Sequence, residues 1–98
     1  MPRQPPEASP AASQAASQAA RRAVGHVTGM TGRDAEGVVG VQRRDDGGWR
    51  VTVEVVETHR IPGSADILAV YETDLDADGE LVAFHRTRRY PRGRVDRP

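Results

Sequence analysis

The chain has no cysteine and no lysine, and its aromatic residues are limited to one tryptophan, two tyrosines and one phenylalanine. Without cysteine, neither a disulfide framework nor a thiolate metal site can form. With so few aromatic side chains, we expect a thin core and a net stability of only a few kcal/mol. No apolar run approaches the roughly 20 residues that span a bilayer. Residues 1–10 also lack the hydrophobic region of a secretory signal. We therefore expect a cytoplasmic protein with no membrane contact.

Charge is balanced over the whole chain, with 14 basic and 14 acidic residues, but it is segregated along the sequence. Residues 66–80 hold six acidic side chains and no basic one, whereas residues 86–97 hold six arginines and a single aspartate. Every basic residue is an arginine, and arginine binds carboxylates and phosphates in a bidentate manner more readily than lysine does. The C-terminal part of the chain therefore has the character of a binding surface.

The N-terminal segment differs in composition from the rest of the chain. Residues 1–10 contain four prolines, which disfavour helix, and two Ala-Ser-Gln-Ala repeats follow. We expect residues 1–19 to be a disordered tail that turns helical near its end, residues 20–93 to be the folded domain, and residues 94–98 to be a flexible basic tail. A helix is predicted over residues 12–28. Its buried face consists of residues at helical spacing, namely Ala16, Ala20, Ala23, Val24 and Val27.

Four segments have strand character, with turn residues between them. They are residues 37–44, 49–57, 67–75 and 80–90. The second of these alternates apolar and polar residues, with Trp49, Val51, Val53 and Val55 on one face. Val56 breaks this alternation, which indicates a bulge or a second buried face. The predicted fold class is α+β, with one N-terminal helix packed on a four-stranded antiparallel β-meander.

The turn before the last predicted strand partly matches a metal-binding loop. Asp74, Asp76, Asp78 and Gly79 match the opening of an EF-hand calcium loop. The match fails at the twelfth position, where His85 stands in place of a bidentate glutamate, and β-type sequence flanks the segment in place of helices. Asp-Gly is also a typical reversal of a β-hairpin. The pattern favours a structural hairpin, and no metal site is expected.

Catalytic and cofactor-binding patterns are also weak. The three histidines, His26, His59 and His85, show no metal-ligand spacing. Ser64 lies near His59 and Asp66 in the sequence, but proximity in one loop is poor evidence for a catalytic triad. The glycines lack the spacing of a phosphate-binding loop. We therefore predict a protein that is not an enzyme, with no catalytic residues, no cofactor and no small-molecule substrate.

The arginine-rich end of the last predicted strand is the strongest candidate for a functional site. The candidate partner-binding residues are Arg86, Arg88, Arg89, Tyr90 and Arg92. Strict alternation would place Arg86 and Arg88 on one face and Arg89 on the other. Three interpretations stay open: a solvated strand end with a basic tail, a site for an acidic protein surface, and a nucleic-acid site that also uses Arg94. The adjacent acidic turn would oppose a polyanion.

Two stretches of sequence carry a resemblance to a known family. They are EGVVGVQRRDDGGWRVTVEVVETHRIP and DILAVYETDLDADGELVAFHRTRRYPRG. Together they resemble the gas vesicle protein O family of actinobacteria and haloarchaea, over residues 20–93. The resemblance implies a non-catalytic accessory factor for gas vesicle biogenesis that contacts other gas vesicle proteins in the cytoplasm at nascent vesicles. A nucleic-acid-binding regulator of the same gene cluster is the alternative. The hairpin pattern also resembles small PepSY-like domains, which fits the predicted fold.

Overall fold

One α-helix, one short 3-10 helix and four strands make up the described part of the chain, residues 10–93, in this computed structural model. Helix α1 spans Pro10–Thr31, and a short 3-10 helix, η1, spans Gly63–Ala65. The strands are β1 (Asp34–Arg43), β2 (Trp49–Thr58), β3 (Ile67–Leu75) and β4 (Leu81–Pro91). They pair in the order β1-β2-β3-β4, and every pairing is antiparallel, which confirms the predicted α+β meander.

Helix α1 starts at Pro10, inside the segment predicted to be a tail (residues 1–19). It ends at Thr31, shortly after the predicted helix end at residue 28. Its first turns are rich in alanine and glutamine, which favour helix. It ends where Gly32 adopts a φ of 67° and its N–H bonds the Thr28 carbonyl at 2.8 Å. The predicted tails at residues 1–9 and 94–98 lie outside the described residues.

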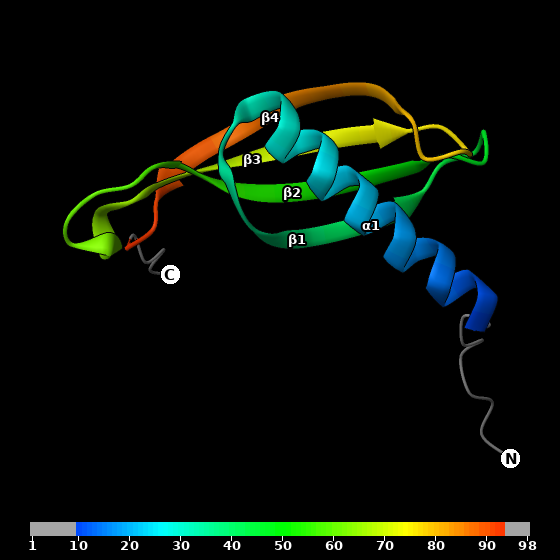
Figure 1. The fold of residues 1–98 in the computed structure, drawn as a ribbon, viewed down its shortest axis with the longest axis horizontal. Coiled ribbons are helices and arrows are strands. Elements are labelled where there is room, and N and C mark those ends of the chain that lie inside the picture. Colours follow the sequence, from blue (N-terminus) through cyan, green and yellow to red (C-terminus); the bar gives the residue numbers. More distant parts are fainter. Residues whose placement is uncertain (1–9, 94–98) are drawn as a thin grey trace, which may run out of the picture.

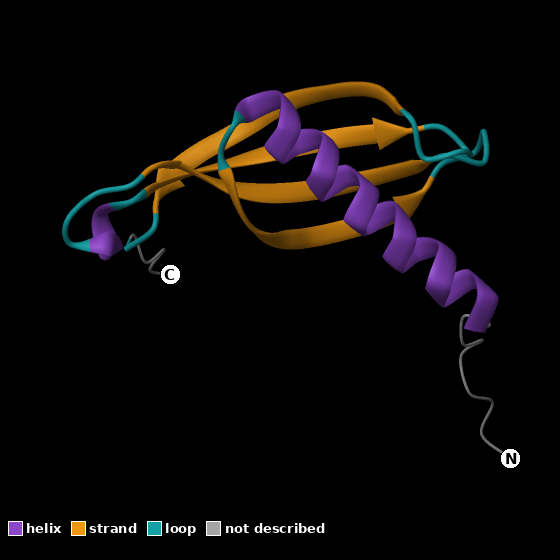
Figure 2. Ribbon diagram, in the orientation of Figure 1, coloured by secondary structure: helices purple, strands orange, loops and turns teal. Residues whose placement is uncertain are grey.

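The helix covers one face of the sheet and crosses it diagonally (Figure 1). Its N-terminal end projects past the β1 edge, and its C-terminal end lies over β4. The opposite face of the sheet has no helix on it among the described residues (Figure 2). The molecule therefore has two layers, with one sheet face covered and one open.

The core lies between α1 and the covered face of the sheet. The helix contributes Ala19, Ala23 and Val27, all buried. The sheet contributes Val51, Val53, Val55, Ala69 and Leu75, each with 0% exposure. The predicted facing of β2 is thus confirmed, because residues that alternate along a strand share one face. The helix supplies mainly small side chains, so polar contacts also matter for its attachment.

A second, smaller apolar cluster lies on the open face. Val56, Leu68 and Val70 are buried outside the main core cluster. In the sheet register Leu68 stands opposite both Val56 and Tyr90. A register shift follows Val56, between it and Thr58. The break in alternation at Val56 therefore marks both a bulge and a second buried face.

Candidate interaction surfaces

Two register shifts in the β3–β4 pairing decide where the arginines of β4 lie. One shift leaves Thr87 without a direct partner, because Tyr71 pairs with Arg86 and the preceding Val70 pairs with Arg88. A bulged residue reverses the alternation of the residues after it. The expectation that Arg86 and Arg88 share a face is therefore wrong.

The observed grouping is different. Arg86 and Arg89 stand opposite Tyr71 and Ala69, on the face that α1 covers. Arg88 stands opposite Val70, on the open face. The sequence-predicted site is thus divided between the two faces of the sheet.

On the covered face, Arg86 and Arg89 converge on one carboxylate. Arg86 Nη1 lies 3.0 Å from Glu57 Oε2, and Arg89 Nη2 lies 2.8 Å from Glu57 Oε1. The Glu57 side chain is 14% exposed, whereas the two arginine side chains are about half exposed. Two guanidinium groups against one carboxylate leave a net positive charge at this position. The arrangement also shows that these arginines are held in a geometry that binds a carboxylate.

On the open face, Tyr90 and Arg88 form a separate contact. The Tyr90 hydroxyl donates a hydrogen bond to the Glu54 carboxylate. This bond, together with partial burial, raises the pKa of Tyr90, because the phenolate would lose the bond and face the Glu54 charge. The Arg88 guanidinium lies 4.9 Å from the centre of the Tyr90 ring, within cation–π range.

Arg92 joins the end of β4 to two other parts of the chain. Its guanidinium binds both oxygens of Glu36, at 2.7 and 2.8 Å, and lies 3.4 Å from Asp66 Oδ2. The bidentate bond lowers the pKa of the Glu36 carboxyl and raises the pKa of Arg92. Asp66 is buried and also accepts from the Arg60 N–H at 2.7 Å. Arg92 therefore fastens the β2–β3 loop and the start of β1 to β4. Arg94 lies outside the described residues.

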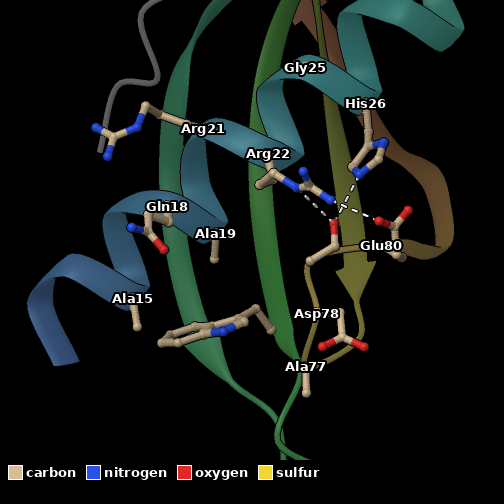
Figure 3. A pocket seen from close by; sticks show the side chains of 12 residues that line it. Ala15, Gln18, Ala19, Arg21, Arg22, Gly25, His26, Ala77, Asp78 and Glu80 are labelled. Atoms are coloured by element: carbon tan, nitrogen blue, oxygen red, sulfur yellow. Dashed lines mark hydrogen bonds and ion pairs between the residues drawn. The ribbon is translucent and has the colours of Figure 1, made fainter. Parts of the chain in front are cut away.

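A second feature, which sequence reasoning missed, is an open groove of about 820 Å³ between α1 and the β3–β4 turn (Figure 3). Trp49 lines it, together with Ala15 and Gln18 from the helix and residues 77–80 from the turn. At its rim Arg22 Nη2 donates to Glu80 Oε1 at 2.9 Å, and Arg22 Nε donates to the Gly79 carbonyl at 3.3 Å.

His26 completes this tie between the helix and the turn. His26 Nε2 lies 3.1 Å from the Gly79 carbonyl, and a carbonyl can only accept, so Nε2 must carry the proton. Gly79 has a φ of 84°, and a Cβ there would lie 3.0 Å from Arg22 Nε. A signal for the groove rim exists in the sequence: Gln18, Arg22 and His26 recur every four residues, which places them on one side of the helix.

The acidic turn is a hairpin connection in the structure. Asp76 Oδ1 accepts from the N–H groups of Asp78 and Glu80, at 2.9 and 3.0 Å. Asp74 instead bonds Arg50 Nε at 2.9 Å, which lowers the pKa of the Asp74 carboxyl. Within residues 10–93, no group of three or more acidic or histidine side chains is placed to hold a metal ion.

Among the described side chains, the β2–β3 loop shows no serine–histidine–aspartate triad. His59 Nε2 lies 3.2 Å from Asp34 Oδ2, and His59 Nδ1 lies 3.8 Å from Asp66 Oδ2. The side chain of Ser64 lies outside the described part of the structure.

The fold and these surfaces define a small α+β domain with an open sheet face, an arginine-rich strand end and a groove beside its helix. The family model described as "Gas vesicle synthesis protein GvpO" matches residues 3–96. The chain therefore belongs to the gas vesicle synthesis protein GvpO family, and the resemblance seen in the sequence is confirmed. The match also covers residues 3–19, which that resemblance did not include.

Curated relatives support the same assignment. Gas vesicle protein O of Streptomyces sp. (strain CB03234) is 50% identical over 68 residues, which are 69% of this chain and 52% of the relative. Gas vesicle protein O of Haloferax mediterranei is 38% identical over 58 residues, 59% of this chain and 41% of the relative. Gas vesicle protein O1 of Halobacterium salinarum is 40% identical over 58 residues, 59% of this chain and 48% of the relative. The chain thus spans about half the length of the relatives it matches.

No solved structure gives a significant match to this chain, so the PepSY-like character of the fold stays a prediction. Among the described residues, no helix is long and apolar enough to cross a membrane.

Proposed function

We propose that this chain acts in gas vesicle biogenesis as a non-catalytic accessory protein that binds other gas vesicle proteins, in the cytoplasm at nascent vesicles. Membership of a gas vesicle synthesis family supports the process. The arginine-rich end of β4, formed by Arg86, Arg88, Arg89, Tyr90 and Arg92, is the proposed docking surface. Its partner is an acidic protein surface.

The observation that carries this proposal is the shared carboxylate at Glu57. Arg86 and Arg89 both bind Glu57, yet both arginine side chains are about half exposed. One acidic side chain of a partner can therefore add to this pair without displacing an existing bond, and it would neutralise the excess positive charge. Arg92 is different, because Glu36 and Asp66 already surround it.

The same pairing favours protein over nucleic acid as the partner. A strand of phosphates requires several cations with few acidic neighbours. Here Glu57 binds two of the arginines, and Glu36 and Asp66 bind a third. The acidic side chains would repel a polyanion along much of this surface.

The test compares two variants in cells that make gas vesicles and have this chain as their sole copy of the protein. In the first, Arg86→Gln, Arg89→Gln and Glu57→Gln are combined, so that no carboxylate is left buried without a cation. In the second, Glu57→Gln alone keeps both arginines. We expect the first variant to fold but to lose vesicles and co-purifying vesicle proteins, and the second to retain both.

Normal vesicles with the folded triple variant would contradict this docking surface. Salt-sensitive binding of DNA or RNA by the purified wild-type chain, lost in the triple variant, would contradict the choice of a protein partner. Circular dichroism of each purified variant provides the control for folding.

A further inference from the structure

The two edges of the sheet have opposite character. At the β4 edge, Arg86, Arg88, Arg89 and Pro91 are features that block the addition of another strand. At the β1 edge, residues 37–41 carry neither a charge nor a proline. The valines in that segment are exposed: Val38 by 37%, Val39 by 62% and Val41 by 40%. Within the described residues β1 pairs with β2 alone, and Figure 1 shows no strand beyond it, although the N-terminal end of α1 projects past this edge.

We propose that the β1 edge binds the β1 edge of a second copy of this chain, antiparallel and about a twofold axis, so that one sheet continues through both copies. The order of charges along β1 supports this occupant. Asp34 lies at its start and Arg43 at its end, and both side chains are exposed. Antiparallel self-pairing places the acidic end of each strand beside the basic end of the other, whereas a parallel arrangement would place like charges together.

Self-pairing would give a closed assembly. A twofold contact uses the β1 edge of both copies, and the remaining outer edges are the two arginine-rich β4 strands. Those edges resist further addition, so the assembly stops at a dimer. Two register shifts in β1, after Ala35 and after Val38, bend the strand and shorten the ladder that can form. We therefore expect a weak dimer that dissociates on dilution.

The chain offers a closely matched pair of substitutions to test this. Val39 on β1 is 62% exposed and Val82 on β4 is 59% exposed, and each lies in a register shift of its edge strand. Lysine at an edge opposes strand addition. By sedimentation velocity at rising concentration, we expect wild type and Val82→Lys to dimerise and Val39→Lys to remain monomeric and folded. A wild-type chain that stays monomeric, or a Val39→Lys variant that dimerises equally well, would overturn the proposal.

Charge reversal tests the orientation of the two copies. Asp34→Arg and Arg43→Glu each place like charges together in a homodimer, so each variant alone should dimerise less than wild type. A mixture of the two restores both contacts, because each altered end then faces its opposite charge. Hydrogen exchange should show protection of the β1 amides in the mixture and in wild type. Failure of the mixture to form a heterodimer would contradict the antiparallel arrangement.

Discussion

Replacing Val53 by aspartate tests the core directly. Val53 has 0% exposure and lies between Val38 of β1 and Tyr71 of β3, on the face that α1 covers. A carboxylate there has no cation in its register and must be protonated to stay buried. Shifting an aspartate from a pKa of about 3.9 to above 7 costs about 4 kcal/mol at pH 7. Loss of the buried valine side chain adds roughly 1.5 kcal/mol.

The sum is comparable with the whole stability expected of this domain. Small domains have roughly 0.05 to 0.15 kcal/mol per residue, and a core of valines and alanines favours the lower part of that range. We therefore expect Val53→Asp to be largely unfolded at pH 7. Because its folded-state pKa is raised, the penalty is lost as the pH falls toward about 4, and structure should partly return.

The matched control is Thr52→Asp, one residue away on the open face. Thr52 is half-buried and stands opposite Glu72, so the like charges should cost up to about 1 kcal/mol. Urea unfolding followed by circular dichroism measures both variants and Val53→Ala, which removes volume without adding charge. Equal midpoints for Val53→Asp and Thr52→Asp would refute the assigned facing, and a Val53→Asp variant that gains no structure in acid would refute the electrostatic explanation.

Strand boundaries and facing were predictable from the sequence where the alternation is unbroken. The third predicted strand, residues 67–75, coincides with β3, and the valines of β2 lie on the predicted face. Along these strands a residue pattern of period two identifies the face that α1 covers, although Val56, Leu68 and Val70 are buried on the other face. The register of the β2–β3 pair is regular from Trp49 to Val56, so the pattern is not interrupted.

The last strand was not predictable in the same way. Thr87 and Val82 each fall at a register shift of the β3–β4 pair, and neither residue type distinguishes a bulge from a regular position. After each shift the alternation is reversed, so that Arg89 lies with Arg86 and not opposite it. The bulge depends on the partner strand and the turn, and a single sequence carries no direct record of either.

The groove and the ion pair at the end of β4 depend on residues far apart in the chain. Arg22 reaches Glu80 on the β3–β4 turn, and Arg92 reaches Glu36 at the start of β1. The sequence shows that such residues have opposite charges, but it does not show which arginine meets which carboxylate. Several arginines and acidic residues compete; the packing of α1 selects the pair of Arg22 with Glu80, and the arrangement of the strand ends selects the pair of Arg92 with Glu36.

Two further predictions concern single contacts. Tyr90→Phe removes the bond to Glu54 and should cost about 1 kcal/mol at pH 7. Because the folded-state pKa of Tyr90 is raised, the stability this group contributes is present below pH 10 and is lost as the pH rises through the folded-state value. The wild type should thus lose more stability than Tyr90→Phe in alkaline urea titrations, and parallel losses would contradict the assignment. Gly48→Ala places a Cβ 2.1 Å from the Leu75 carbonyl oxygen, in backbone that cannot rotate away, so we expect a cost of about 3 kcal/mol or more. Gly37→Ala is the control, because nothing lies within 4 Å of its Cβ and its φ is not in the left-handed region. If both alanine variants unfold at the same urea concentration, the close approach of the β1–β2 turn to the end of β3 does not exist in solution, and the groove beside it must have a different shape.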